Sequence, residues 1–308
     1  MTIDAHPELP EFDYIRPASL AEASRFLAEH AGEARPLLGG TDIFVRMRDG
    51  FWHDRYLVDV KKLEGTDELR FDPVDGLTIG AGVNMNRIMA HPAVQQHYPA
   101  LAEACRWVAS YQLRTRATVV GNICNASPAG DTIGACLLYD GVLKVHGLSG
   151  WREVPLANSF FQGPGKTSLQ PGDIATSLHL PLPPPGASGV YLKLGRNNWS
   201  DLSIVGVTVV GYANPAAVSG WTFRLALASV APIPLVVPQV QETLESSPID
   251  LPALRHAARL AQQACRPIDD VRGSARYRKA MVRTLSEKAL KTVWGRINVQ
   301  AALPEGSI

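Results

Sequence analysis

Two glycine-containing segments in the first half of the chain carry residue types suited to a phosphate-bearing ligand. The first is residues 38–43, LGGTDI, in which paired glycines follow a short apolar run. Glycine has no Cβ, so the backbone there can approach a ligand closely. The Thr41 hydroxyl and the N–H groups at the start of a following helix would add donors for a diphosphate. The alternative interpretation is an ordinary strand–helix turn with Asp42 as the helix N-cap.

The second segment is residues 118–131, TVVGNICNASPAGD. Its composition predicts a strand over residues 118–120, then a glycine turn and several small hydrogen-bonding side chains. Apart from Arg114 and Arg116 just upstream, the run is uncharged until Asp131. It therefore suits burial against a neutral or internally compensated ligand, with the acid free to bind a ribose hydroxyl. The alternative is a loop held by Asn and Ser turns.

The common catalytic and metal-binding motifs are missing. The sequence has no G-x-S-x-G or H-E-x-x-H pattern, its eight histidines show no metal-ligand spacing, and its four cysteines form no C-x-x-C pair. Residues 163–167, GPGKT, end like a Walker A loop, but Phe160 stands where a glycine is needed and Pro164 removes a backbone N–H. We therefore exclude an NTPase. Two segments suited to an anion, in a chain without hydrolytic or metal-binding motifs, indicate an elongated cofactor that carries a diphosphate.

Short strands and helices must position these segments. A capping box of Ser19 and Glu22 predicts a helix that begins near residue 20. Four prolines within residues 181–186 predict a boundary between two parts of the chain. Helices are also expected at 43–48 and 99–109, with two or three more near the C-terminus. Strands are expected at 35–38, 56–60, 77–80, 118–120, 142–146, 190–194, 203–212 and 221–230.

The last helix has the most regular pattern. Apolar residues recur every four positions and predict its buried face: Tyr277, Met281, Leu285, Ala289 and Val293. The basic residues off that stripe predict a solvated face or, alternatively, a partner-docking surface: Arg276, Arg278, Lys279, Arg283, Lys288 and Lys291.

The composition is that of a soluble globular protein of about two domains. The 308 residues are 46% hydrophobic and 19% charged, with a formal net charge of +1, which disfavours nucleic acid or an anionic membrane as the main partner. Residues 202–223 carry no charge, but their Asn-Pro and Ser-Gly turn formers predict two strands instead of a membrane span. The first residues lack the features of a secretory signal, and four unpaired thiols favour a reducing cytoplasm.

At these residues the chain resembles the medium, FAD-binding subunit of the molybdenum hydroxylases, the xanthine dehydrogenase and carbon monoxide dehydrogenase family. The family has A-G-G-T-D-L at residues 38–43 and T-V-G-G-N-x-x-x-A-S-P-x-x-D at residues 118–131. Further similar motifs are GPGKT at 163–167, YLKLGR at 191–196, DLSIV at 201–205 and PIDDVRGSARYR at 267–278. The resemblance runs from about residue 12 to about residue 295 with the motifs in order.

The resemblance implies an α+β fold with two domains. Residues 1–180 would form a two-lobed, PCMH-type FAD-binding domain akin to the vanillyl-alcohol oxidase flavoproteins. Residues 187–295 would form a small C-terminal domain of the carbon monoxide dehydrogenase flavoprotein type, an antiparallel sheet plus helices that closes over the flavin.

The resemblance also implies the residues that hold FAD. In the family both loops wrap the FAD diphosphate, an acid contacts the cofactor, and a lysine lies near the flavin, where a cation would stabilise the reduced ring and raise its potential. The corresponding residues here are Leu38, Gly39, Gly40, Thr41, Asp42, Ile43, Thr118, Val119, Gly121, Asn122, Asp131 and Lys193, with Val108 as a weaker match that lines the site.

Two positions depart from the family pattern. Val120 replaces the first glycine of T-V-G-G-N; because a β-branched residue avoids positive φ, we expect extended backbone there and close approach at Gly121 alone. Trp199 and Ser200, before Asp201, also differ and would alter access to the flavin ring.

The resemblance implies an electron-relay subunit that is not itself the place of substrate oxidation. A large molybdenum-cofactor subunit would oxidise the substrate, and a small subunit with two [2Fe–2S] clusters would pass electrons on. FAD in this chain would deliver them to NAD⁺, a quinone, oxygen or another acceptor. Molybdopterin and the clusters would belong to the partners, in a dimer of heterotrimers. No residue of this chain is expected to be catalytic or to bind metal.

Two other classes of function remain open. One is a stand-alone flavin oxidase or dehydrogenase of the vanillyl-alcohol oxidase type, which would hold its own substrate and often bonds FAD covalently; Cys124 is the nearby thiol. The other is a scaffold that has lost the cofactor.

Overall fold

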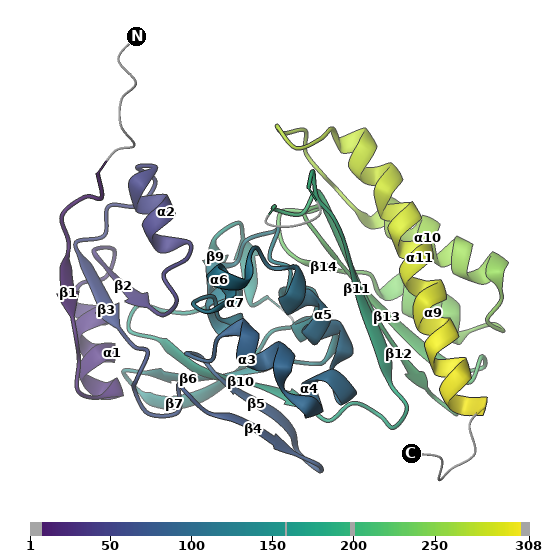
Figure 1. Ribbon diagram of the computed structural model, residues 1–308, viewed down its shortest axis with the longest axis horizontal. Coiled ribbons are helices and arrows are strands. Elements are labelled where there is room, and N and C mark those ends of the chain that lie inside the picture. The colour runs from purple at the N-terminus through teal and green to yellow at the C-terminus, as the bar shows by residue number, and fades with distance from the viewer. Residues whose placement is uncertain (1–7, 158, 198–200, 303–308) are drawn as a thin grey trace.

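The structure is a computed structural model that describes residues 8–157, 159–197 and 201–302. Three sheets lie along the long axis of the molecule (Figure 1), with the N-terminal lobe at one end and the last helices at the other.

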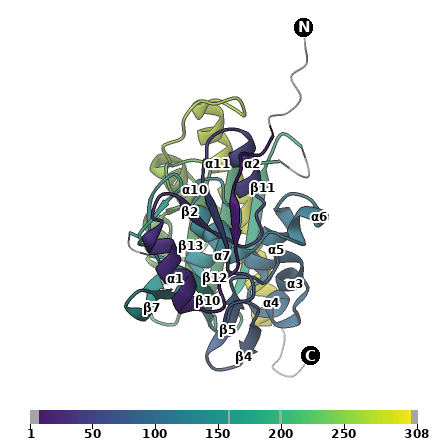
Figure 2. The ribbon, with the colours of Figure 1, turned by 90° about the vertical axis from the view of Figure 1, so that its left-hand side faces the viewer.

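The N-terminal lobe is a parallel sheet of order β1-β3-β2, formed by β1 (Asp13–Ile15), β2 (Ala34–Leu37) and β3 (Tyr56–Asp59). Helix α1 (Leu20–Glu29) connects β1 to β2, and α2 (Ile43–Arg48) follows β2. The predicted capping box starts α1, because the Ser19 hydroxyl accepts the Glu22 N–H and the Glu22 carboxylate accepts the Ala18 N–H. Helix α1 contacts the middle sheet, and the end-on view in Figure 2 looks onto α1 and β2 of this lobe.

The middle sheet is antiparallel, with order β4-β5-β10-β6-β7. Its strands are β4 (Leu69–Asp72), β5 (Gly76–Gly80), β6 (Val142–Gly147), β7 (Gly150–Pro155) and β10 (Ile174–Pro181). Six helices lie between β5 and β6, and all but the fourth of them contribute buried apolar residues to one core with this sheet. These are α3 (Met85–Ala90), α4 (Pro92–His97), α5 (Pro99–Trp107), α6 (Tyr111–Arg114), α7 (Val119–Asn125) and α8 (Ile133–Leu138).

The C-terminal sheet is antiparallel, with order β11-β12-β13-β14. Its strands are β11 (Ser188–Leu194), β12 (Val205–Ala213), β13 (Trp221–Ala228) and β14 (Leu235–Val236). Helices α9 (Pro238–Glu245) and α11 (Ala275–Ala302) pack on this sheet, and α10 (Leu251–Ala264) packs on both of them.

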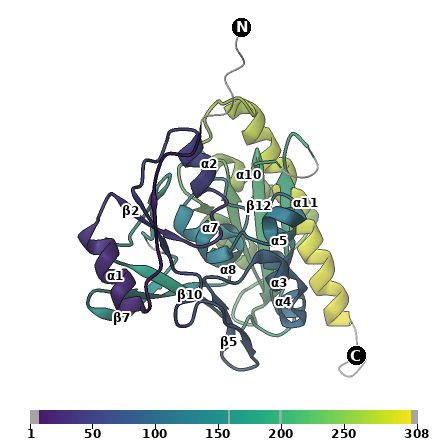
Figure 3. The same cartoon turned by 60° about the vertical axis from the view of Figure 1, so that its left-hand side comes forward.

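Helix α8 lies between the two large sheets. All six of its residues are buried, and it contacts β12, β13 and α7; Figure 3 shows α7 and α8 in the centre of the molecule. The approach to β12 is close, since a Cβ on Gly134 would stand 2.5 Å from the Thr208 hydroxyl oxygen. The segment after α7 is therefore enclosed by both halves of the chain.

Most predicted elements are present within one to three residues of their expected bounds. The strand predicted at residues 118–120 is wrong: apart from one isolated bridge to Asn84, this stretch is the N-cap and first turn of α7. The GPGKT segment forms the hairpin of β8 (Phe161–Gly163) and β9 (Lys166–Thr167), which is no phosphate-binding loop before a helix. The prolines from residue 181 end β10 and connect it to β11.

The pattern of the last helix is partly wrong. Ala289 and Val293 are buried as predicted, but Tyr277 is 45% exposed, and Arg278, expected on the solvated face, is 1% exposed. Among the described helices, none is long and apolar enough to cross a membrane.

Candidate cofactor site

The first predicted segment leaves β2 and enters α2. Gly40 has φ +73°, a conformation that an L-residue rarely adopts, and Phe44 N–H bonds its carbonyl oxygen. Asp42 stands at the N-cap of α2, but its side chain makes no capping hydrogen bond. Among the described residues, none accepts a hydrogen bond from the backbone N–H groups of residues 39–43, so five successive donors are available to a ligand.

The second segment begins a helix. The Thr118 hydroxyl caps α7 by accepting the Gly121 N–H at 3.0 Å. The backbone at Val120 is therefore helical, not extended as predicted, and its side chain is fully buried. A β-branched residue fits here because the helix needs only negative φ. Gly121 is also helical, and a Cβ on it would stand 2.7 Å from the Thr118 hydroxyl oxygen.

The two segments touch. A Cβ on Gly39 would lie 2.1 Å from the carbonyl oxygen of Arg116, two residues before the α7 cap, and the Leu38 side chain reaches within 4.0 Å of the Cβ position of Gly121. Burial raises the pKa of the Asp42 carboxyl, and the Asn125 side chain at the other end of α7 is among the groups that oppose this rise. Gly39 is thus required by contact between the two segments, which the sequence alone did not indicate.

Asn122 connects α7 to the chain that follows it. Its amide oxygen accepts the Thr132 hydroxyl at 2.9 Å. A Cβ on Gly130 would lie 3.0 Å from that same oxygen. The segment that carries Asp131 is therefore packed directly against the predicted diphosphate-binding helix.

Asp131 belongs to a buried polar cluster that spans both halves of the chain. Its carboxylate accepts the Tyr191 hydroxyl at 2.5 Å and the Lys193 ammonium at 2.8 Å, and the ammonium also donates to the Trp107 carbonyl at 3.1 Å. The Lys193 and Asp131 side chains are 4% and 8% exposed. Burial raises the pKa of the Asp131 carboxyl, and Lys193 opposes that rise. Asp131 is therefore held on two sides and is not the free acid that its sequence context predicted.

Val108 follows α5 in a turn beside Trp107. Its carbonyl accepts a 2.7 Å hydrogen bond from Arg114, whose guanidinium also donates to the carbonyls of Arg106 and Ala109. Arg114 is 7% exposed, and Ala109 has φ +38°. Arg114 thus fixes the turn of residues 106–109. This turn includes both Val108 and the Trp107 carbonyl that Lys193 contacts.

The predicted residues therefore lie in one contiguous region of the described chain. The unpaired N–H donors of residues 39–43 lie against the segment that begins α7, and Lys193 is a buried cation paired with Asp131. Donors and a cation are what a dinucleotide diphosphate and an electron-rich ring require.

Two family models together match almost the whole chain. The model described as the FAD binding domain in molybdopterin dehydrogenase matches residues 10–183. The chain belongs to this family. The model of the CO dehydrogenase flavoprotein C-terminal domain matches residues 190–293.

Similar proteins agree with this membership. A xanthine dehydrogenase FAD-binding subunit of Escherichia coli O157:H7 is 30% identical over 278 residues, which cover 90% of this chain and 94% of the relative. The carbon monoxide dehydrogenase medium chain of Hydrogenophaga pseudoflava is 31% identical over 289 residues, 93% of this chain and 98% of the relative. A chain in a carbon monoxide dehydrogenase structure from the same organism superposes with a TM-score of 0.88 at 29% identity, covering 94% of this chain and 99% of that chain.

Membership in the family confirms several predictions made from the sequence. The chain is a flavoprotein subunit of the molybdenum hydroxylase type, an oxidoreductase with an α+β fold and FAD as its cofactor. The relatives favour this subunit over a stand-alone flavin oxidase. Burial also raises the pKa of the Cys124 thiol to about 12, so little of the thiolate that a covalent flavin bond needs is present at neutral pH.

Some contributors to the site were missed from the sequence. Tyr191 was identifiable, because residues two apart on a strand share a face and Lys193 was already assigned. Arg114 was noted only as a charge upstream of the second segment. Trp199 and Ser200, predicted to affect access to the flavin, lie outside the described residues. Among the described residues, no group of three or more His, Cys, Asp or Glu side chains could hold a metal ion.

Proposed function

We propose that FAD lies between the two contacting segments, and that this chain relays electrons from [2Fe–2S] clusters of a partner subunit to a terminal acceptor. When bound, FAD supplies the capacity to exchange electrons singly or in pairs. The observation that carries the proposal is the contact of Gly39 with the Arg116 carbonyl, because it places the free donors of residues 39–43 beside the start of α7.

The chain's own residues bind and orient the cofactor. The N–H groups of residues 39–43 bind the diphosphate, with Thr118, Val119, Gly121 and Asn122 on its other side. Asp131 and Val108 line the site. Lys193 holds a positive charge near the flavin, and its orientation is set by the carbonyl of Trp107 and the carboxylate of Asp131.

We further propose the setting in which the subunit works. Relatives named as medium chains and FAD-binding subunits support a large molybdenum-cofactor partner and a small [2Fe–2S] partner, assembled as a dimer of heterotrimers in the cytoplasm. The division into domains at residues 1–180 and 187–295 is part of this proposal. NAD⁺, a quinone and oxygen are the candidate acceptors.

A Gly39→Ala variant tests the cofactor site. Because its Cβ would stand 2.1 Å from the Arg116 carbonyl oxygen, the two segments must separate, and we expect FAD binding at least tenfold weaker and stability lower by about 1–3 kcal/mol. Fluorescence titration of the full chain with FAD measures the affinity. Gly295→Ala on α11 is the control, since a Cβ there meets nothing within 4 Å. Equal FAD affinity in Gly39→Ala and wild type would refute this location of the diphosphate.

The stand-alone alternative makes a different prediction for the purified chain. With FAD bound and no partner present, we expect dithionite to bleach the flavin, and aldehydes, purines and aromatic alcohols to leave it oxidised. Direct bleaching by one of these organic compounds would favour an independent oxidase or dehydrogenase.

A further inference from the structure

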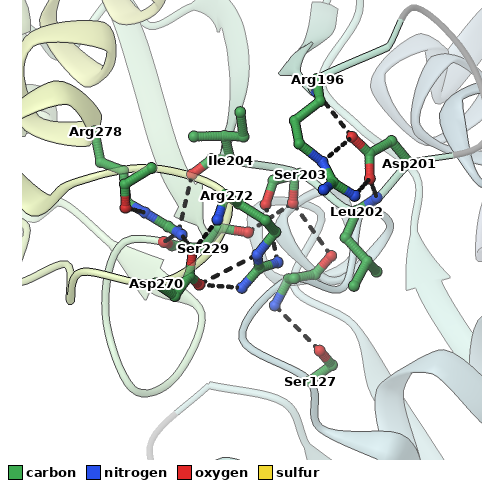
Figure 4. A network of polar contacts seen from close by, with 12 residues as sticks. Ser127, Arg196, Asp201, Leu202, Ser203, Ile204, Ser229, Asp270, Arg272 and Arg278 are labelled. Carbon is green, nitrogen blue, oxygen red and sulfur yellow. Dashed lines mark hydrogen bonds and ion pairs between the residues drawn. The ribbon is translucent and has the colours of Figure 1, made fainter. Parts of the chain in front are cut away.

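Arg278 is the largest fully buried side chain in the described chain, although it lies on the first turn of α11. Its guanidinium donates to the carbonyls of Ser229 at 2.8 Å and Ile204 at 3.3 Å, and to that of Gly273 at 3.4 Å. It also pairs with Asp270 at 2.5 Å. Figure 4 shows the guanidinium between these groups. One side chain thus joins the N-terminal end of α11 to the beginning of β12 and the end of β13.

The buried charge is compensated. The Asp270 carboxylate also accepts from the Arg272 guanidinium at 2.7 Å and from the Arg272 N–H at 2.8 Å. Arg272 in turn donates to the Ser203 carbonyl at 3.4 Å. A buried ion pair with good hydrogen-bond geometry fixes the relative position of the segments that it joins, and removal of one partner leaves an unpaired charge.

The segments that Arg278 binds, around Ile204 and Ser229, also contact residues 128–129, which lead to Asp131. The Ser229 N–H donates to the Pro128 carbonyl at 2.7 Å. The Ser203 hydroxyl lies 2.6 Å from the Ser229 hydroxyl and 3.4 Å from the Ala129 carbonyl. Ser203 is fully buried, and Ser229 is 9% exposed. The C-terminal half therefore donates hydrogen bonds to two successive carbonyls, those of Pro128 and Ala129, just before Gly130 and Asp131.

Ser229 has an uncommon backbone conformation. Its φ is +66°, which disfavours an L-residue and persists only where the surroundings enforce it. Here the N–H, the hydroxyl and the carbonyl are all engaged, and the carbonyl is engaged by Arg278. Arg278 thus helps to hold the conformation through which Ser229 reaches Pro128.

We propose that Arg278 is a positioning residue for the cofactor site: acting through Ser229 and Ser203, it sets the path of residues 128–131 and hence the place of Asp131 and its partner Lys193. This proposal rests on the proposed function, because it assumes that FAD lies beside Asp131. It assigns to α11, at the far end of the sequence from the glycine segments, an indirect influence on how the flavin is held.

An Arg278→Lys variant tests the proposal in the full chain reconstituted with FAD. Lysine keeps the charge beside Asp270 but cannot reach all three carbonyls in the fixed geometry of a guanidinium. We expect FAD binding at least tenfold weaker and an altered visible circular dichroism spectrum and midpoint potential of the FAD that remains bound. Arg276→Lys, at an exposed position two residues earlier on the same helix, should leave all three unchanged.

A purely structural role predicts a different result. In that case Arg278→Lys would lower the melting temperature and leave the affinity, spectrum and potential of bound FAD at wild-type values, and the proposal would be overturned. If the variant does not fold, Ser203→Ala decides. It leaves the Arg278–Asp270 pair intact and removes only the hydroxyl beside Ser229 and Ala129, and we expect FAD binding three- to tenfold weaker with a changed flavin spectrum. Wild-type FAD properties in that variant would overturn the proposal.

A double variant tests whether the two residues act along one path. If Arg278 and Ser203 both act through Ser229, the loss of FAD affinity in Arg278→Lys/Ser203→Ala should be smaller than the product of the single losses. Independent, multiplicative losses would contradict the path through Ser229. A wild-type chain that binds no FAD would instead refute the proposed cofactor site itself.

Discussion

Lys193 and Asp131 form a buried pair in which each charge depends on the other. A Lys193→Met variant removes the cation and leaves the Asp131 carboxylate with the Tyr191 hydroxyl as its remaining partner. In the proposed site this charge lies near the flavin, and its loss would disfavour the reduced form. We therefore expect the midpoint potential of bound FAD to fall by about 30 mV or more, where 30 mV corresponds to about 1.4 kcal/mol for a two-electron couple. Spectroelectrochemistry of the reconstituted chain measures the potential.

The double variant Lys193→Met/Asp131→Asn separates the two charges. It leaves no uncompensated carboxylate, so its potential should lie above that of Lys193→Met. A potential that is the same in wild type and Lys193→Met would remove Lys193 from the tuning of the flavin.

Asp201 gives a pH dependence with a definite sign. Hydrogen bonds from Arg196 lower the pKa of its carboxyl from the ordinary 3.8 to about 2. Because the folded state holds the ionised form more strongly, the stabilisation is fully present above the ordinary pKa and is lost as the pH falls through the folded pKa. The difference in melting temperature between wild type and Asp201→Asn should therefore be largest above about pH 5, shrink as the pH falls toward 2, and vanish only below about pH 2. A constant difference across this range would contradict the ion pair.

At the residue scale, the sequence predicted which residues gather but not how they bond. Gly39, Asn122, Asp131 and Lys193 do lie in one contiguous region. The sequence did not indicate that Asp131 is held by Tyr191 and Lys193, because such contacts join residues about 60 positions apart. The burial of Arg278 was equally hidden, since periodicity identifies arginine only as a polar residue.

Among the elements, α7 depends on its N-cap residue, Thr118. Thr118→Ala removes the hydroxyl that accepts the Gly121 N–H, and we expect a loss of about 1 kcal/mol in the free energy of unfolding, with weaker FAD binding because α7 begins at the site. Thr118→Ser keeps an acceptor and serves as the control. Urea unfolding monitored by circular dichroism measures both; equal losses in the two variants would show that the methyl group, not the cap, matters.

The error at residues 118–120 has a physical cause. Three β-branched residues in succession, Thr118, Val119 and Val120, favour a strand by local preference. In the structure Thr118 is an N-cap, while Val119 and Val120 are fully buried in the main core. Burial of both valines outweighs the small cost of a β-branched residue in a helix.

For the whole molecule, Glu103 on α5 connects the two halves. Its carboxylate accepts the Tyr191 N–H of β11 at 2.9 Å and pairs with Arg296 of α11 at 3.0 Å. Glu103→Ala leaves the Tyr191 N–H without its acceptor, and we expect the free energy of unfolding to fall by about 1–3 kcal/mol. Glu103→Gln keeps an acceptor oxygen and should lose less. Thermal unfolding followed by calorimetry checks this, and identical stability in Glu103→Ala and wild type would contradict the connection.

The overall architecture could be anticipated from the sequence where motifs occur in order. The proline run at residues 181–186 separates the middle sheet from the C-terminal sheet, and the strands on both sides were found. Composition and spacing do not specify that α8 is enclosed between two sheets, because its neighbours β12 and β13 lie about 70 to 90 residues further along the chain.

The contacts of Glu103 and Arg296 with β11 have one more effect. β11 is the outermost strand of its sheet, and the outward-facing groups of Gly189 and Tyr191 are those that a strand from another molecule would use. Arg296 donates to the Gly189 carbonyl, and Glu103 accepts the Tyr191 N–H. These side chains thus occupy the groups through which a strand of another molecule would pair with β11, which disfavours edge-to-edge association at this strand.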